Sequence, residues 1–257
     1  MTLYGPSRLE FVINASDFSF PVGRVEFLRG INKAPLADKL HEFDFNKPPS
    51  QALHQLYTQH LRTFIAVGGV PEAVKIYRDT GSWMEVARVK EAILETFLAD
   101  FGKYQKRIKS DVIQQVFRKL PLLISRKTIY SHLAEGERIE TNRKALEALE
   151  LARVVTRCFH SAVNGLPLAA ERKNNHFKTF FLDIGLALTA LGLNIDAVSM
   201  ELNDTARGVV AEQFIAQHLL DDREMFQKPQ LFYWNRQKQG ATSEVDFLTA
   251  YKGKASQ

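Results

Sequence analysis

Two acidic residues near the end of the sequence are suited to metal-ion chemistry. Glu244 and Asp246 stand in the stretch SEVDFLTAY, whose pattern of apolar residues predicts a β-strand. Successive side chains of a strand point to opposite faces, so Glu244 and Asp246 share one face. Because hard oxygen ligands such as carboxylates suit Mg²⁺, the pair predicts a divalent-metal site.

A third acid, Glu212, lies in a predicted helix that precedes this strand. Metal-dependent nucleases of the PD-(D/E)XK type have one acidic residue on a helix and a second on the strand that follows. The next strand carries a further acidic residue and a lysine. There the acids hold magnesium, and the lysine positions water or stabilises developing negative charge. The sequence stops four residues after Gly253, before any such strand, so we expect a truncated site unless Lys252 or Lys254 supplies the lysine. The alternative is that the three acids are solvated surface residues.

Other catalytic motifs have no support in the sequence. A phosphate-binding loop requires Gly-Lys followed by Ser or Thr, but Gly102-Lys103 precedes tyrosine and Gly253-Lys254 precedes alanine. We therefore expect no ATP site built from this chain alone. The single cysteine, Cys158, excludes an internal disulfide and a cysteine pair for zinc.

The middle of the sequence is basic, although the whole chain has a net charge of only +5. Between Lys103 and Lys178 there are 16 Lys and Arg residues against 7 Asp and Glu residues. Such an excess favours a partner with a phosphate backbone, such as duplex DNA, although a solvated basic surface would give the same count.

The basic segment predicts three helices followed by a β-hairpin, the order of a winged helix-turn-helix. The expected elements are helices at 112–120, at 128–133 and after an N-cap at Thr141, then strands at 154–159 and 166–170 around Asn164-Gly165. In such a fold the third helix enters the DNA major groove. The predicted DNA-binding residues are Arg126, Lys127, Arg143 and Lys144.

The remaining segments predict strands near the N-terminus and then several helices. RLEFVI and RVEFLR are expected to be strands, and Gly68-Gly69 to end a helix before Pro71. A later helix, from about Gly208 to Leu220, is expected to share one face among Ala211, Phe214, Ile215, His218 and Leu219. We therefore expect an α+β fold that is mainly helical.

Five stretches occur in an order typical of one protein family. FPVGRVEFL, GGVPEAVKIY, DFGKY, FKTFFLDIGL and FYWN…EVDFL resemble a prokaryotic group of AAA+ superfamily ATP-binding proteins in which a domain of unknown function follows the ATPase core. The chain resembles the downstream portion of that family, from about Gly5 to Gly253. The resemblance implies that the strands with the ATP- and magnesium-binding motifs would precede Met1. It further implies that Ser7 is the remnant of a nucleotide sensor and that Arg24 lies near the ATP site.

The resemblance also implies four segments. These are a remnant of the AAA+ core (1–52), a helical, lid-like segment (53–105), a winged-helix-like domain (106–185) and a truncated nuclease-like α/β domain (186–257). RGINKAPLADKL replaces the aromatic helix that the family has after VEFL. Together with the early ending, this difference predicts that the chain is a fragment.

Three functions follow as hypotheses. The leading one is a partial AAA+ family protein without ATPase activity of its own that binds duplex DNA through a basic winged helix. The second is a metal-dependent nuclease-like enzyme that uses Glu212 and Asp246 with Mg²⁺. The third is a protein-interaction module, in a homo-oligomer or with another protein. A cytoplasmic, non-membrane location is expected, because no apolar run approaches the roughly 18 residues of a spanning helix and the N-terminus does not resemble a signal peptide.

Overall fold

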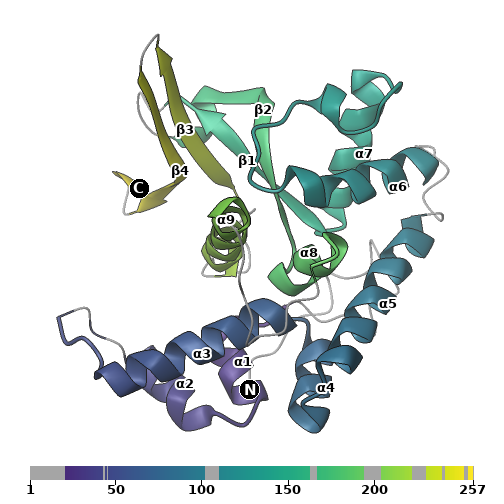
Figure 1. The fold of residues 1–257 in the computed structure, drawn as a ribbon. Helices are drawn as coiled ribbons and strands as arrows, with labels where there is room; N and C mark the ends of the chain where they lie inside the picture. Colours follow the sequence, from purple (N-terminus) through teal and green to yellow (C-terminus); the bar gives the residue numbers. More distant parts are fainter. Residues whose placement is uncertain are drawn as a thin grey trace. The chain divides into compact units, whose positions relative to one another are not determined.

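The chain divides into two compact units (Figure 1). A computed structural model describes residues 21–42, 44, 46–101, 110–162, 167–193, 204–221, 230–238, 241–251 and 254–256. Unit 1 comprises Met1–Asp100 and Leu182–Asn203, and unit 2 comprises Phe101–Phe181 and Asp204–Gln257. The α+β, mainly helical class is confirmed, whereas the division into four consecutive segments stays a prediction. Among the described helices, none is both long and apolar enough to cross a membrane.

Unit 1 is helical throughout its described part. Its elements are α1 (Arg24–Gly30), α2 (Ala34–His41), α3 (Gln51–Val67), α4 (Pro71–Thr80), α5 (Trp83–Phe101, whose last residue belongs to unit 2) and α8 (Ile184–Ala190).

The strand predicted for RVEFLR is wrong, because this stretch forms α1. Its adjacent residues Phe27 and Leu28 are both buried, which a helix facing two neighbours allows and a half-buried strand does not. The Phe27 ring contacts Phe64 of α3 at 5.1 Å between centroids, while Leu28 packs against Leu36 and Ala37 of α2. The other predicted strand, RLEFVI, lies outside the described residues.

A close approach between two distant segments organises unit 1. The predicted break at Gly68-Gly69 is confirmed, since α3 ends at Val67 and α4 begins at Pro71. The Asp183 carboxylate accepts hydrogen bonds from the Leu186 N–H (2.9 Å), which caps α8, and from the Gly69 N–H (2.7 Å). A Cβ at Gly68 would lie 2.3 Å from Asp183 Oδ1, so only glycine permits this contact. The stretches GGVP and FFLDIGL therefore meet in space.

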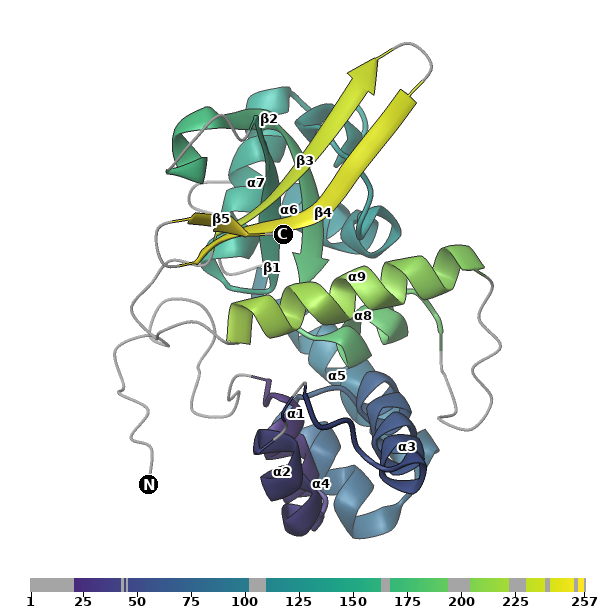
Figure 2. The same ribbon diagram turned by 90° about the vertical axis from the view of Figure 1, so that its left-hand side faces the viewer.

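Unit 2 contains a mixed sheet in the order β2-β1-β3-β4-β5 (Figure 2). The strands are β1 (Val155–Ser161), β2 (Arg172–Phe181), β3 (Leu231–Lys238), β4 (Ala241–Tyr251) and β5 (Lys254–Ser256). β1 pairs antiparallel with β2 and parallel with β3, and β3 pairs antiparallel with β4. The strands predicted from LFYWN and EVDFLTAY are thus confirmed as β3 and β4.

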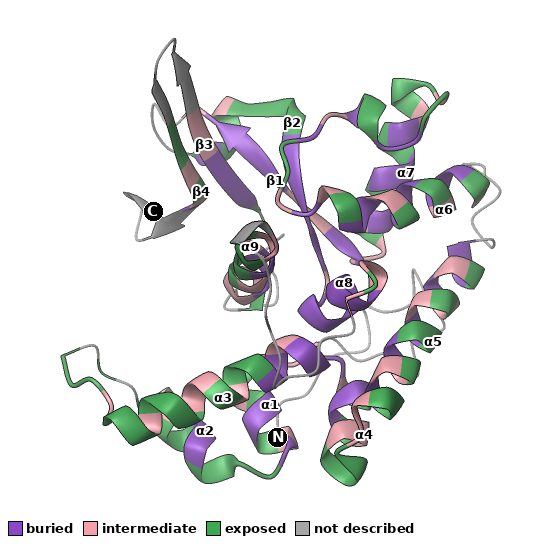
Figure 3. Ribbon diagram, viewed as in Figure 1, coloured by how far each residue is buried: buried purple, intermediate pink, exposed green. Residues whose placement is uncertain are grey.

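The second strand of the predicted hairpin is displaced along the chain. Leu168–Glu171 form a short 3-10 helix, η5, and β2 begins only at Arg172. The apolar run LPLAA resembled a strand, but Pro167 within it directly precedes η5, and among the described residues of the run only Leu168 is buried. The predicted turn at Asn164-Gly165 lies outside the described residues. Figure 3 shows β2 changing from exposed at its start to buried at its end.

The pairing of β1 with β2 contains an irregularity. Phe159 stands opposite Phe177, but the next residue, His160, stands opposite Lys173. The residues 174–176 are therefore extra on β2, as in a β-bulge.

Besides η5, the described helices of unit 2 are α6 (Ser110–Lys119), η3 (Leu120–Leu123), η4 (Tyr130–His132), α7 (Ile139–Leu151) and α9 (Asp204–Asp221). The helix predicted at 128–133 is only the 3-10 turn η4. The Asn142 side-chain amide donates hydrogen bonds to the carbonyl oxygens of Tyr130 (2.9 Å) and Ala134 (3.0 Å). These carbonyl oxygens therefore have partners without the backbone N–H groups of a longer helix. The N-cap of α7 is Arg138, and Thr141 lies inside the helix, so the cap prediction is also wrong.

The two faces of β2 contact different helices. Phe181 and Phe177 contact the rings of Phe117 in α6 and Tyr130 in η4, at 5.9 and 4.9 Å between centroids. Lys178, which points the other way, contacts α9. Isolated bridges from Ile124 to Thr179 and from Thr128 to Phe177 attach the segment between η3 and η4 to β2.

Candidate functional site

A buried lysine stands among the acids that the sequence singled out. The Lys178 side chain in β2 is only 3% exposed. Its Nζ lies 2.9 Å from Glu212 Oε2 in α9 and 2.9 Å from Asp246 Oδ1 in β4. Glu244 Oε1, also in β4, lies 3.1 Å away. We call these four residues the Lys178 cluster. Three acids from two separate elements thus meet around one ammonium group.

Local structure explains how α9 and β4 reach Lys178. The side-chain amide of Gln213 accepts from the Phe181 N–H and donates to the Phe181 carbonyl, both at 2.9 Å. These two bonds fix α9 against the end of β2 and bring the adjacent Glu212 to Lys178. The strand alternation that predicted a shared face for Glu244 and Asp246 is confirmed, because both carboxylates contact the same ammonium.

The charges of the cluster stabilise one another. Burial alone would lower the pKa of Lys178, but hydrogen bonds to Asp246 and Glu212 outweigh it and raise the pKa above the ordinary lysine value. Burial alone would raise the pKa of Glu244, but hydrogen bonds from Lys127 and Lys178 lower it. Lys127 Nζ lies 2.7 Å from Glu244 Oε2. At neutral pH the lysine is therefore charged and Glu244 is ionised.

Two aromatic titratable residues lie beside the cluster. Lys178 Nζ is 5.6 Å from the centre of the Tyr233 ring in β3. Burial raises the pKa of Tyr233 to about 12. The His160 ring of β1 meets the Tyr233 ring edge-on at 5.4 Å between centroids. Tyr233 therefore stays neutral and connects the Lys178 cluster to His160.

His160 is buried with one ring nitrogen unused. The residue is 7% exposed, and its Nε2 lies 3.4 Å from the Asn235 carbonyl oxygen. Its Nδ1 has no hydrogen-bond partner among the described residues. Burial lowers the pKa of His160, and the positive charges of Lys173, His176 and Lys127 lower it further, although the hydrogen bond to Asn235 opposes them. The neutral imidazole is favoured.

The Lys178 cluster does not fit a metal ion in this arrangement. Within the described ranges, no group of three or more His, Cys, Asp or Glu residues is placed to hold one. Glu212 and Asp246 each place one carboxylate oxygen on Lys178, and both oxygens of Glu244 contact ammonium groups. A metal ion would have to displace Lys178 from these oxygens. The metal-binding role of Glu212, Glu244 and Asp246, and the catalytic role of Glu212 and Asp246, stay predictions.

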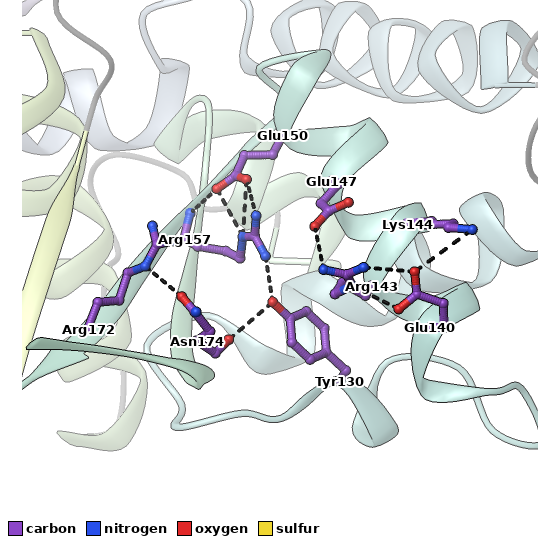
Figure 4. A network of polar contacts seen from close by, with 9 residues as sticks. All are labelled: Tyr130, Glu140, Arg143, Lys144, Glu147, Glu150, Arg157, Arg172 and Asn174. Carbon is purple, nitrogen blue, oxygen red and sulfur yellow. Dashed lines mark hydrogen bonds and ion pairs between the residues drawn. The ribbon is translucent and has the colours of Figure 1, made fainter. Parts of the chain in front are cut away.

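The two predicted DNA-binding residues of α7 are paired within their own helix (Figure 4). Arg143 Nη2 lies 2.8 Å from Glu140 Oε1, and Arg143 Nη1 lies 3.8 Å from Glu147. Lys144 Nζ lies 3.8 Å from Glu140. With Glu150 included, α7 carries three glutamates and two cations, so it offers no excess of positive charge.

A second network in Figure 4 joins α7 to the sheet. Arg157 of β1 donates through Nε to both Glu150 carboxylate oxygens at 3.1 Å, and through Nη1 to the Tyr130 hydroxyl at 2.7 Å. The Tyr130 hydroxyl in turn donates to the Asn174 carbonyl at 3.2 Å. Because the Arg157 side chain is 10% exposed and its guanidinium is occupied, its role is to hold the fold together.

The other two predicted DNA-binding residues lie between the bridges to β2. Arg126 is exposed, whereas Lys127 pairs with Glu244 and so adjoins the Lys178 cluster. The exposed start of β2 adds Arg172, Lys173 and His176, and the Arg172 guanidinium lies 4.5 Å from the centre of the Phe159 ring.

The residues assigned to nucleotide sensing lie near the N-terminus. Arg24 is the exposed first residue of α1 in unit 1, and Ser7 lies outside the described residues. Their proposed roles stay predictions.

The sequence did not single out Lys178, His160 or Tyr233. A signal for Lys178 was present, because a single lysine within the apolar stretch FKTFF must find carboxylate partners if the strand is buried. His160 and Tyr233 carried no such signal, since both residue types are common in ordinary cores.

Comparison with known proteins identifies a family. A comparison with curated proteins and one with solved structures each found no match. Residues 58–197, more than half of the chain, match DUF8612, a domain of unknown function. The match covers the end of α3, the contact of Gly68 and Gly69 with Asp183, and both β1 and β2 with Lys178. The description of this family does not mention an ATPase, so the AAA+ resemblance stays a prediction. The chain belongs to the DUF8612 family.

Proposed function

We propose that the chain binds duplex DNA through unit 2. The order of elements from α6 to β2 supports the proposal. It consists of a helix, a segment bridged to β2 at Ile124 and Thr128, the short turn η4, a second full helix α7, and the antiparallel pair β1–β2. Helix, bridging segment, turn, helix and antiparallel strands is the order expected for a winged-helix protein.

The charge of this segment favours a phosphate-rich partner. Exposed cations stand on the segment between the bridges, at Arg126, and at the start of β2, at Arg172 and Lys173. Contacts of arginine and lysine with phosphates position a protein on DNA without reading its sequence. We therefore propose binding with little sequence preference.

Salt-dependent binding tests this proposal. The full chain is titrated into a fluorescently labelled duplex of about 20 base pairs at several salt concentrations, with anisotropy as the readout. The logarithm of the association constant should fall linearly with the logarithm of salt concentration, with a slope of about −0.9 for each phosphate contacted. Absent binding at low salt, or binding that salt does not weaken, would refute the proposal.

A nuclease-like activity is the second candidate function, because three acids predicted to form such a site converge on Lys178. The position of Lys178 between the carboxylates argues against it. Plasmid cleavage with Mg²⁺ or Mn²⁺ is the test. Asp246→Asn should abolish cleavage, whereas Glu135→Gln, which changes an exposed acid of the same unit, should not. No cleavage with either metal removes this candidate.

The AAA+ resemblance is retained as a proposal about ancestry. If the chain is the downstream part of such a protein, it should not bind ATP by itself, because it lacks the phosphate-binding loop. Micromolar ATP affinity in a titration would contradict this view.

A further inference from the structure

One exposed arginine of unit 2 is held in a fixed position. Arg172, the first residue of β2, donates from Nε to the Asn174 side-chain oxygen at 2.7 Å (Figure 4). Its guanidinium lies 4.5 Å from the centre of the Phe159 ring, which is a cation–π contact. Its backbone stands opposite Ser161 in the β1–β2 ladder. The strand pairing, the hydrogen bond and the ring contact together restrict a side chain that would otherwise move freely in solvent.

The two groups that hold Arg172 are themselves anchored. The Asn174 carbonyl oxygen accepts from the Tyr130 hydroxyl at 3.2 Å, and this hydroxyl accepts from Arg157 Nη1 at 2.7 Å. The Arg157 guanidinium also lies 5.0 Å from the centre of the Phe159 ring, and Phe159 is 9% exposed. The buried Arg157 network therefore fixes the groups on which the exposed guanidinium of Arg172 rests.

The terminal nitrogens of Arg172 are available to a ligand. Nε is used by Asn174, whereas Nη1 and Nη2 have no hydrogen-bond or ion-pair partner within the described part of the chain. Both terminal nitrogens of Arg143, by contrast, lie within 4 Å of glutamates of α7. Arg126 is exposed, and nothing among the described residues holds its side chain. Arg172 combines a fixed position with uncommitted donors.

A fixed guanidinium with two free terminal nitrogens suits an oxyanion. Its planar N–H groups match two oxygens of a phosphate or carboxylate at once, which an ammonium group cannot do. Because Arg172 is already restricted, binding costs it little additional side-chain entropy. The next residue, Lys173, is also exposed and adds positive charge beside it. The arrangement favours an anion with two oxygens side by side, such as a phosphodiester.

We propose that Arg172 binds one phosphate of the DNA backbone through Nη1 and Nη2, and that Asn174 and Phe159 position its guanidinium. This assignment rests on the proposed DNA binding and names a residue that performs it. Arg143 makes no comparable contact, because its guanidinium is already paired. The contribution of Arg172 therefore depends on the shape of the guanidinium as well as on its charge.

Two charge-removing substitutions test the location. Arg172→Gln and Arg143→Gln each remove one guanidinium of unit 2. In the salt titration, Arg172→Gln should reduce the magnitude of the slope by about 0.9, the value for one phosphate contact. Arg143→Gln should leave the slope unchanged. A slope that Arg172→Gln does not alter, or that both variants reduce equally, would overturn the assignment.

Two charge-conserving substitutions test the use of both terminal nitrogens. Arg172→Lys retains the positive charge but replaces the planar fork with a single ammonium, so the salt slope should stay close to the wild-type value. Its Kd should rise about tenfold, the loss expected for one hydrogen bond to a charged group. Arg126→Lys is the matched control, and its Kd should equal that of the wild-type chain. Wild-type affinity in the Arg172→Lys chain would show that the fork is not used.

A double-mutant cycle on DNA affinity tests the positioning by Asn174. Asn174→Ala removes the acceptor of Arg172 Nε and leaves every charge in place, so it should weaken binding without changing the salt slope. In an Arg172→Gln background, Asn174→Ala should have no further effect on Kd. An equal effect in both backgrounds would show that Asn174 does not act through Arg172.

The outcomes separate the two proposals. If the wild-type chain fails to bind DNA at low salt, the proposed function is wrong and the assignment to Arg172 fails with it. If the chain binds and both Arg172 variants behave like wild type, only the assignment is wrong. Arg172 and Asn174 are exposed, so their variants are expected to fold, and circular dichroism of each variant checks this.

Discussion

The Lys178 ammonium and the Asp246 carboxylate lie 2.9 Å apart, although 68 positions separate them in the sequence. The lysine side chain is 3% exposed, whereas the aspartate side chain is 52% exposed. Lys178 is therefore the buried member of the pair, in the buried half of β2, and Asp246 is the more exposed member, in β4. A buried ammonium without its carboxylates would be strongly unfavourable, so this contact adds to the pairing with β3 in holding β4 in place.

Replacing Lys178 should destabilise unit 2 severely. Lys178→Met leaves Glu212, Glu244 and Asp246 close together without the cation between them. Removing one member of a buried ion pair costs about 3–5 kcal/mol, and the partial exposure of Asp246 places this case near the lower figure, about 3 kcal/mol. Urea unfolding followed by Trp234 fluorescence in a Trp83→Phe background measures unit 2, because Trp83 and Trp234 are the two tryptophans and Trp83 lies in unit 1.

Lys127 provides the matched control for this prediction. Lys127→Met removes a lysine that also contacts Glu244, but its side chain is 38% exposed. Exposed pairs contribute about 0–1 kcal/mol, so this variant should lose no more than that. Equal losses in the two variants would show that Lys178 does not hold the cluster together.

Acid should weaken unit 2 through Glu244. Its pKa is lowered in the folded state, so its contribution to stability is complete above the ordinary glutamate pKa of about 4.3 and is lost as the pH falls through the lower folded value. The free energy of unfolding should therefore fall as the pH decreases below about 4.3. Glu244→Gln should be less stable than wild type at pH 7, and the difference should shrink toward pH 3. A difference that does not change with pH would contradict the ion pairing of Glu244.

Parts of the Lys178 cluster could be predicted from the sequence because they depend on local periodicity. The alternation in SEVDFL placed Glu244 and Asp246 on one face, and the helical pattern placed Glu212 on a helix earlier in the chain. The lysine could not be assigned in this way. It comes from β2, 34 positions before Glu212, and only the sheet order brings it close.

The buried face of α9 differs from the face predicted from hydrophobicity, because a buried polar residue has hydrogen-bond partners there. The expected inner face included Ala211 and Ile215, but both are exposed. The buried residues are instead Val210, Gln213, Ala216 and Gln217. Gln213 can be buried because its side-chain amide hydrogen-bonds to the backbone of Phe181. The sequence around Gln213 gives no indication of this partner. The strand pattern of RVEFLR was likewise overridden by contacts with α2 and α3.

His160 should make the stability of DNA-free unit 2 depend on pH near neutrality. Burial, together with neighbouring cations, lowers its pKa in the folded state. Between that value and the unfolded value of about 6.5, the unfolded chain binds more protons, so the free energy of unfolding falls as the pH decreases below about 6.5. His160→Gln should flatten the curve between pH 7 and 5, measured by urea unfolding. His132→Gln, at an exposed position of the same unit, serves as the control and should retain the wild-type slope.

The contact between Gly68 and Asp183 predicts a large difference between two glycine substitutions. Both Gly68 (φ +84°) and Gly81 (φ +65°) have positive φ values. Gly81 has ψ +5° in the left-handed helical region, where an alanine costs about 1–2 kcal/mol. Gly68 has ψ −177°, in a region that essentially only glycine adopts. A Cβ at Gly68 would also lie 2.3 Å from Asp183 Oδ1, whereas a Cβ at Gly81 meets no described atom within 4 Å.

Gly68→Ala should therefore destabilise unit 1 by more than about 3 kcal/mol, since strain adds to the hydrogen bonds that Asp183 loses when it is displaced. Gly81→Ala should cost about 1–2 kcal/mol. Urea unfolding followed by Trp83 fluorescence in a Trp234→Phe background reports on unit 1. A double-mutant cycle with Asp183→Ala isolates the contact, because Gly68→Ala should cost less once the carboxylate is gone. If the cost of Gly68→Ala is the same in both backgrounds, backbone strain alone explains the effect, and the Asp183 contact does not require the glycine.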